Sequence, residues 1–237
     1  MERVKAKILG IDVDTFTFDE ALAHIWETKG QVVTINPEMI STAQQNNDFK
    51  KLVDEASLII PDGIGVQIGL KLLGHNVRRI AGIEFGKALI KKCCEEGKTI
   101  AMVGAKKEVV ELATKNLTEE FSGLKIAYSH DGYFSDSKPI LDEVVNASPD
   151  VVLVALGSPK QEFFIKELKT RLPQSIFIGL GGSFDVWAGV VKRAPEIYQK
   201  MGLEWLYRTV KEPQRFKRIF PTLPLFVLKV LKERLWK

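Results

Sequence analysis

The chain alternates short, continuously apolar runs with longer amphipathic segments, and this rhythm limits its possible folds more than any other feature. Runs such as VVLVAL at 151–156 place hydrophobic side chains at successive positions, so a strand made from them is apolar on both faces. Strands of this kind occur in parallel sheets that helices cover on both sides. The order strand, helix, strand therefore predicts a doubly wound, mostly parallel α/β sheet with right-handed crossovers.

The expected elements follow one another closely between residues 17 and 182. A capping box of Thr17 and Glu20 opens the first helix, which is expected to close at Gly30. Asn36 is the expected N-cap of a second helix, with Pro37 as its first residue. Strands are expected at 31–36, 57–60, 98–104, 124–132, 150–157 and 175–182, and further helices from about 64 and at 83–97, 106–121, 135–147 and 159–172. This order is Rossmann-like, and residues 1–193 are expected to form the sheet domain.

From about residue 194 the alternation stops, and residues 194–237 have a helical pattern interrupted by prolines. We expect a helical appendage there, cut into pieces by the prolines. Residues 192–237 carry 12 lysines and arginines against 4 acidic residues, a net charge of +8, although the whole chain carries only +4. Such asymmetry predicts a surface for a negatively charged partner, which could be nucleic acid, anionic lipid or a phosphate-bearing substrate.

Several protein classes are disfavoured by what the sequence lacks. The N-terminal segment has no apolar leader, so no signal peptide is expected, and no run of about 18 apolar residues predicts a transmembrane helix. The only cysteines, Cys93 and Cys94, are adjacent, which excludes a disulfide framework and a four-ligand zinc set and indicates reduced thiols. The G-x-G-x-x-G, Walker A and G-x-S-x-G motifs are all missing.

Metal binding has little support in the sequence. The three histidines, His24, His75 and His130, do not have the spacing of metal ligands. Asp12 and Asp14 match the D-x-D pattern that many sugar transferases use for a metal, but three-residue patterns arise easily by chance. A solvated turn at the exit of the first strand is the favoured interpretation of this pair. We therefore expect neither a metal nor a cofactor.

Polar residues and glycines gather where the predicted strands end. In an open parallel sheet, ligands bind outside the carboxyl ends of the strands. Glycine lets the backbone approach a phosphate there, and the following helix offers unpaired N–H groups and the positive end of its dipole. Any one of these glycines could serve steric needs alone, but together they favour a nucleotide or sugar-phosphate site. The residues concerned are Thr34, Asn36, Asp62, Gly63, Gly104, Asp131, Gly132, Gly157, Gly181 and Gly182.

Two side chains at this edge have open interpretations. Asp62 is either an ordinary turn residue or a general base, if a substrate hydroxyl comes within hydrogen-bond reach. Ser158 and Gln161 form a capping box around Pro159, the expected first helical residue, which would give these residues a structural role. Gln161 would also stand at the ligand edge, where it could donate to phosphate or sugar oxygens.

Taken in order, a set of motifs resembles the WecG/TagA/CpsF glycosyltransferases. They are TINPEM, PDGIGV, RRIAGIEF, LGSPKQE, GLGGSFDVWAG, KRAPE, GLEWLYR and EPQRFKR, and they span roughly residues 8–220. The resemblance implies an inverting, metal-independent transfer of N-acetylmannosamine from its UDP form to N-acetylglucosamine on undecaprenyl diphosphate. The product would be the β-linked disaccharide of the wall teichoic acid linkage unit, although some members use the uronic acid of the donor sugar.

The resemblance also implies roles for individual residues. Asp62 would be the base, Thr34 and Asn36 would line its pocket, and Gln161 would contact the donor. Arg79 would be the pocket arginine, with Arg78 beside it left open. Arg208, Arg215 and Arg218 would neutralise the diphosphates, and Gly104, Asp131, Gly132, Gly157, Gly181 and Gly182 are the expected nucleotide-binding residues.

The expected partners are a UDP-sugar donor, the lipid-linked acceptor and an anionic membrane surface. Apolar side chains between Phe216 and Trp236, Phe226 among them, alternate with basic ones, so the tail is expected to dock on the membrane and to complete the active site. The expected location is the cytoplasm, peripheral on the inner face of the cell membrane, with no nucleic acid bound and a homo-oligomer left open. The alternatives are a transferase that uses a nucleotide or S-adenosylmethionine, and a non-enzymatic binder of anionic surfaces.

Overall fold

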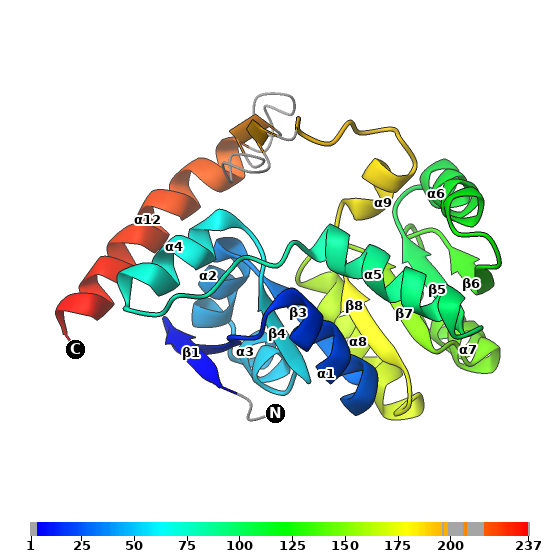
Figure 1. The fold of residues 1–237 in the computed structure, drawn as a ribbon, viewed down its shortest axis with the longest axis horizontal. Helices are drawn as coiled ribbons and strands as arrows, with labels where there is room; N and C mark the ends of the chain where they lie inside the picture. The colour runs from blue at the N-terminus through cyan, green and yellow to red at the C-terminus, as the bar shows by residue number, and fades with distance from the viewer. Residues whose placement is uncertain (1–3, 196, 199–205, 208–215, 237) are drawn as a thin grey trace.

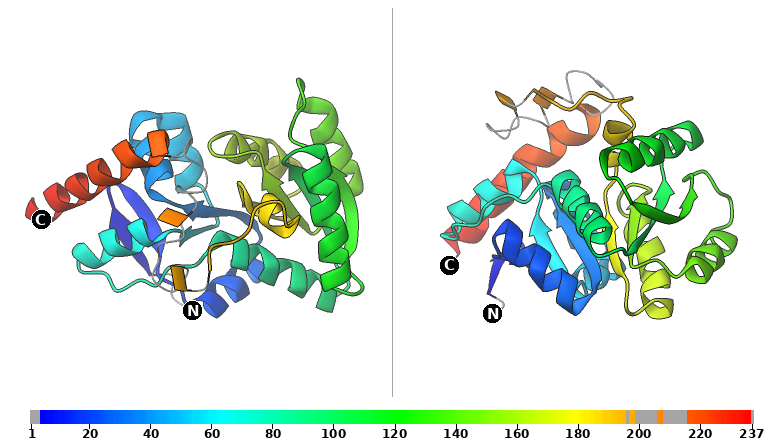
Figure 2. Two further views of the ribbon diagram at one scale, coloured as in Figure 1. Left: turned by 90° about the horizontal axis from the view of Figure 1, so that it is seen from above. Right: turned by 45° about the vertical axis from the view of Figure 1, so that its right-hand side comes forward.

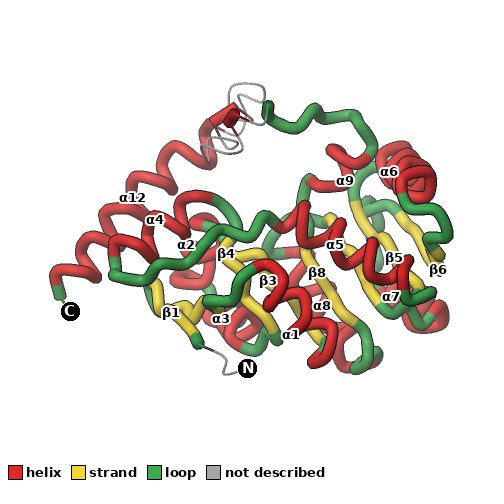
Figure 3. The backbone as a smooth tube through the Cα atoms, viewed as in Figure 1, coloured by secondary structure: helices red, strands yellow, loops and turns green. Residues whose placement is uncertain are grey.

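The computed structural model describes residues 4–195, 197, 198, 206, 207 and 216–236. Its centre is a six-stranded sheet in the order β4-β3-β8-β7-β5-β6, in which every neighbouring pair is parallel. The strands are β3 (Gly30–Ile35), β4 (Leu58–Pro61), β5 (Thr99–Gly104), β6 (Lys125–His130), β7 (Val151–Ala155) and β8 (Ile176–Gly179). Helices lie on both sides of this sheet (Figures 1 and 3), which confirms the predicted α/β class.

The apolar runs are buried on both faces, as their sequence requires. In β7, Val151 and Leu153 face one hydrophobic cluster, while Val152 and Val154 face another. The first cluster is completed by α1 (Phe18–Thr28), α5 (Gly82–Glu95), α6 (Lys107–Glu120) and α9 (Ser183–Trp187). The second is completed by α7 (Lys138–Ala147) and α8 (Lys160–Arg171).

A third hydrophobic cluster lies at the β4 end of the sheet. It contains residues of α2 (Pro37–Gln45), α3 (Asn47–Asp54), α4 (Ile64–Leu72) and an antiparallel hairpin of β1 (Lys5–Ile8) and β2 (Ile11–Asp14). Asp14 is only 1% exposed, and its Oδ2 accepts the Ile59 N–H of β4 over 2.8 Å. The expected solvated turn at Asp14 is therefore wrong, because a backbone donor 45 residues away uses this carboxylate.

Local capping signals predicted two of the helix starts correctly. The Thr17 and Glu20 capping box is present, and the Asn36 Oδ1 accepts the Met39 N–H over 3.0 Å. The capping box at Ser158 was predicted wrongly. Helix α8 begins at Lys160, Pro159 is its N-cap residue, and no side chain caps it. The Ser158 hydroxyl instead interacts with the carboxylate of Glu162.

The C-terminal part of the tail is one helix, α12 (Phe216–Leu235), so the expected break at its prolines does not occur. Packing explains its continuity, because α12 lies across α2 and α4 (Figures 1 and 2) and buries Phe226 and Val230 in the third cluster. Polar contacts secure the same face: the Leu9 N–H donates to Glu233 Oε2 over 2.8 Å, and Lys229 Nζ donates to Gln44 Oε1 over 2.6 Å. Phe226 is therefore a core residue and not part of a membrane-facing surface.

Away from this packed face, α12 and the residue after it expose several large hydrophobic side chains beside the exposed Lys232 and Arg234. They are Leu225, Leu228, Leu231, Leu235 and Trp236, the last two more than 80% exposed. Within the described residues, no helix combines the length and the apolar character needed to span a membrane.

Candidate active site

The carboxyl ends of β3 and β4 bring the predicted base, Asp62, and two predicted substrate-binding residues to one place. Ile35 pairs with Pro61, and the Asp62 N–H donates to the Ile35 carbonyl over 2.8 Å. Asn36 and Asp62 therefore leave neighbouring strands at the same level of the sheet. Thr34, one residue before the end of β3, lies at the same edge.

The Asp62 carboxylate lies against the start of α5. A Cβ atom added to Gly82, the first residue of this helix, would lie 2.9 Å from Thr34 Cγ2 and 3.5 Å from Asp62 Oδ2. Glycine is therefore required there for close approach. No side chain caps α5, so the positive end of its dipole favours a negative charge at this position. The Thr34 hydroxyl donates to the Gly179 carbonyl over 3.2 Å and fixes the threonine side chain.

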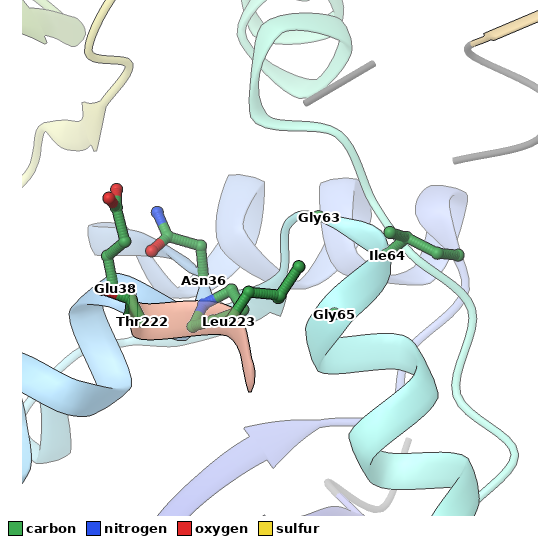
Figure 4. Close-up of a pocket in the computed structure, with 8 residues that line it drawn as sticks. Asn36, Glu38, Gly63, Ile64, Gly65, Thr222 and Leu223 are labelled. Carbon is green, nitrogen blue, oxygen red and sulfur yellow. The ribbon is translucent and has the colours of Figure 1, made fainter. Parts of the chain in front are cut away.

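A pocket of about 150 Å³ opens next to these residues, between the starts of α2 and α4 and the α12 helix. Figure 4 shows the Asn36 amide and the Glu38 carboxylate pointing in the same direction. The apolar residues Ile64 and Leu223 also line the pocket. Sequence reasoning missed Glu38, although its place in the first turn of a helix at the ligand edge was a usable signal. The lining consists of Asn36, Pro37, Glu38, Gly63, Ile64, Gly65, Thr222 and Leu223.

The segment before α5 carries the two candidate arginines. Arg79 is half-buried and Arg78 is exposed, so Arg79 is the better placed of the two. The Arg79 N–H donates to Gln67 Oε1 of α4 over 3.3 Å, and the next N–H, of Ile80, donates to the Pro61 carbonyl over 2.9 Å. These contacts hold the segment beside the end of β4, next to Asp62.

The expected nucleotide-binding glycines fall into two kinds. Gly104 and Gly132 serve packing, because an added Cβ would strike the Ala155 backbone at the first and lie 2.8 Å from Leu156 Cδ2 at the second. Gly157 and Gly181 have positive φ angles of 75° and 49°, and their open sides have no atom within 4 Å of an added Cβ. Gly182 precedes α9 as its N-cap residue. The backbone is therefore open at Gly157 and Gly181, after the ends of β7 and β8.

An exposed aromatic side chain stands at the same edge, beyond β6. Asp131 Oδ1 accepts the Tyr133 N–H over 2.7 Å, which shapes this turn, and the Tyr133 side chain is 76% exposed. Nearby, Lys160 Nζ donates to the Gly132 carbonyl over 3.3 Å and lies 4.7 Å from the centre of the Phe134 ring. Sequence reasoning did not single out Tyr133.

Gln161 does not project from the edge as expected. It is 3% exposed, its Oε1 accepts the Gly181 N–H over 3.0 Å, and its Nε2 donates to Glu162 Oε1 over 2.7 Å. Glu162 is 2% exposed. Burial raises the pKa of the Glu162 carboxyl, and the hydrogen bonds from Gln161, Ser158 and its own N–H oppose that shift.

The remaining candidates lie partly or wholly outside the described structure. Arg208 and Arg215 fall outside the described residues, and Arg218 lies in α12 but its side chain is not described. Within the described residues, no group of three or more His, Cys, Asp and Glu side chains could hold a metal ion. Asp12 pairs with Lys7 at 3.5 Å and Asp14 is buried against β4, so the D-x-D pair does not form an open ligand set.

Comparison with known proteins places this sequence in a family. The sequence matches the model of the Glycosyl transferase WecG/TagA/CpsF family over residues 6–237. The chain belongs to this family. The family match extends beyond the motifs at both ends and includes the whole of α12.

Two curated relatives are similar over most of their length. One, from Bacillus spizizenii strain W23, is 38% identical over 93% of this chain and 86% of its own. The other, from Bacillus subtilis strain 168, is 39% identical over 85% of this chain and 79% of its own. Both are named N-acetylglucosaminyldiphosphoundecaprenol N-acetyl-beta-D-mannosaminyltransferase.

Proposed function

We propose that this chain transfers N-acetylmannosamine from UDP-N-acetylmannosamine to the N-acetylglucosamine of an undecaprenyl-diphosphate-linked acceptor, with inversion. The product is the lipid-carried β-linked disaccharide of the wall teichoic acid linkage unit. The names of the two Bacillus relatives support the acceptor and the transferred sugar. The observation that carries the proposal is the Asp62 carboxylate beside Thr34 at the ligand edge of the sheet, next to the Asn36 and Glu38 pocket.

In this mechanism Asp62 is the general base. It accepts the proton of the acceptor hydroxyl while that oxygen attacks the anomeric carbon from the face opposite UDP. The bond from that carbon to the UDP oxygen breaks, and UDP leaves with the electron pair, so the configuration inverts. Asn36 and Glu38 bind hydroxyl groups of the acceptor sugar, and the apolar walls of Ile64 and Leu223 suit its acetamido methyl group.

The donor lies over the ends of β7 and β8, with the open backbone at Gly157 and Gly181 against its diphosphate. Gly104, Asp131, Gly132 and Gly182 shape the surrounding turns, and the exposed ring of Tyr133 offers a stacking surface for the uracil. Negative charge grows on UDP as it leaves, and guanidinium groups neutralise such charge with paired hydrogen bonds. We assign this task to Arg79, Arg208, Arg215 and Arg218.

Because the acceptor is attached to a membrane lipid, the enzyme must reach it at the membrane surface. The acceptor's diphosphate lies at the level of the lipid headgroups, so the protein must dock on the bilayer surface. The outer leucines and Trp236 of α12, with Lys232 and Arg234 beside them, suit an anionic membrane. We therefore place the chain in the cytoplasm, peripheral on the inner face of the cell membrane.

Product analysis tests this function. The protein is incubated with UDP-N-acetylmannosamine and N-acetylglucosamine-diphospho-undecaprenol in vesicles, and the lipid product is identified by mass spectrometry. The expected result is addition of one N-acetylhexosamine, with stoichiometric UDP release. UDP-N-acetylglucosamine, the C2 epimer, is the matched control donor and should give little product. Release of UDP only with the uronic acid donor would reassign the donor, and no UDP release from any of these sugars would contradict the proposal.

A further inference from the structure

Two consecutive polar side chains, Gln161 and Glu162, are buried at the start of α8. Burying a carboxyl group costs free energy unless hydrogen bonds compensate for the lost water. Gln161 donates to Glu162 Oε1, but the buried Oε2 makes no hydrogen bond of good geometry, so the compensation is incomplete. The mechanism above does not use Glu162. Glu162 is, however, the sequence neighbour of Gln161, whose side chain contacts Gly181 at the donor edge of the sheet.

The contacts of Gln161 define the orientation of its amide. The Gly181 N–H can only donate, so it faces Oε1, and the Glu162 carboxylate oxygen accepts from Nε2 at the other end. The amide nitrogen also packs directly on the Gly179 backbone, where no side chain could fit. A flipped amide would place Nε2 against the Gly181 N–H and leave both without an acceptor.

The segment that Gln161 contacts joins the two halves of the site. The Gly179 carbonyl accepts the hydroxyl hydrogen of Thr34, whose methyl group lies beside Gly82 and the Asp62 carboxylate. Two residues later, Gly181 has open space beside its Cα, where the proposed function places the donor. A shift of residues 179–182 would therefore change both the backbone beneath the donor and the position of Thr34 beside Asp62.

We propose that Glu162 is a positioning residue that acts through Gln161, holding its amide in the orientation that fixes residues 179–182 beneath the donor. The inference rests on the proposed function, because it assigns the donor to this segment. Gln161 then supports the donor indirectly, through the Gly181 backbone. A hydrogen bond to a charged group is worth enough that its loss should weaken donor binding by roughly tenfold to a hundredfold.

Four variants test the relay by two readouts, the dissociation constant of UDP measured by calorimetry and the KM for the donor. Glu162→Leu keeps the volume but removes the acceptor, and it should weaken UDP binding by roughly tenfold or more. Glu162→Gln keeps an acceptor oxygen and should stay within about threefold of wild type. Gln161→Leu should weaken UDP binding as much as Glu162→Leu does. The double variant Gln161→Leu/Glu162→Leu should bind UDP no more weakly than Gln161→Leu alone, because the two residues act in series.

Thermal unfolding identifies any variant that fails to fold, and Glu162→Met then replaces Glu162→Leu. Wild-type UDP affinity in a folded Glu162→Leu or Glu162→Met protein would overturn the inference, and so would fully additive losses in the double variant. Neither of these two results would contradict the proposed function, provided that the wild-type protein binds UDP and transfers the sugar. A wild-type protein that binds no UDP would overturn the proposed function and this inference together.

Discussion

Thr34 and Gly82 are in such close contact that residue 82 cannot carry a side chain without moving its neighbours. An added Cβ would lie 2.9 Å from Thr34 Cγ2 and 3.5 Å from Asp62 Oδ2. Strand β3, the end of β4 and the start of α5 meet at this point. The position of the Asp62 carboxylate therefore depends on a packing contact as well as on its own strand.

This contact predicts that a side chain at residue 82 lowers activity, and that a smaller residue at position 34 restores it. Gly82→Ala should push Thr34 and Asp62 apart and lower turnover by about tenfold or more, because small displacements at a reacting group are costly. Thr34→Ser removes the methyl group that the new side chain would meet and keeps the hydroxyl that bonds to Gly179. The double variant should therefore recover most of the lost turnover. If Thr34→Ser lowers the turnover of Gly82→Ala further, the packing account is wrong.

The two faces of α12 predict two different phenotypes. Replacing the outer residues Leu228, Leu235 and Trp236 by serine should leave the fold unchanged but abolish sedimentation with anionic vesicles, because interfacial apolar burial is lost. Replacing the inner residue Phe226 by alanine should lower the free energy of unfolding by about 3 kcal/mol. Leu112→Ser, an exposed leucine of α6, is the matched control for vesicle binding. Unchanged sedimentation of the triple variant would contradict membrane docking through this face.

Metal removal should have no effect on the transfer. Asp14 is buried as an acceptor for β4, and Asp12 pairs with Lys7, so the D-x-D pair is engaged in packing the hairpin. We expect full activity in excess EDTA and in an Asp12→Asn variant. Activity that disappears with EDTA and returns with Mg²⁺ or Mn²⁺ would show that a metal supplies the charge assigned here to arginines.

The buried Glu162 carboxyl predicts a pH-dependent stability difference. Because burial raises its pKa in the folded state, the folded protein holds this proton more tightly than the unfolded chain does. The resulting stabilisation is present below the pKa of glutamate in the unfolded chain and is lost as the pH rises through the higher folded pKa. Glu162→Gln removes the ionisable group, so its Tm should exceed that of wild type at pH 7.

Lowering the pH should shrink this difference in Tm, since wild type then regains the proton. Glu167→Gln changes an exposed carboxyl on the same helix and should show no such trend. A difference that stays constant between pH 7 and pH 4, or that grows on acidification, would show that Glu162 is not destabilised by its charge.

The sequence predicted those features whose causes are local. The apolar runs of β5 and β7 are buried on both faces, and Asn36 caps the residues that immediately follow it. The grouping of Thr34, Asn36 and Asp62 at one edge follows from parallel pairing, which the pattern of strands and helices already implied.

The sequence failed where distant residues decide the outcome. Asp14 is buried because β4 supplies a donor, and α12 continues through its prolines while Phe226 packs into a distant cluster. The sequence around Gln161 matches a capping box, but in the structure the Gln161 amide bonds to Gly181 and Glu162 instead. Such long-range contacts leave no periodic signal, so the inward orientation of Gln161 was found only in the structure.

Turnover of an Asp62→Asn variant tests the central claim most directly. Asparagine keeps the size of the side chain but cannot accept the acceptor's proton, so the rate of N-acetylmannosamine transfer to the lipid-linked acceptor should fall by about 10²–10⁴-fold. UDP binding and Tm should remain close to wild type, and the surface variant Asp12→Asn should keep its activity. A folded Asp62→Asn protein that transfers the sugar at nearly the wild-type rate would contradict the assignment of Asp62 as the base.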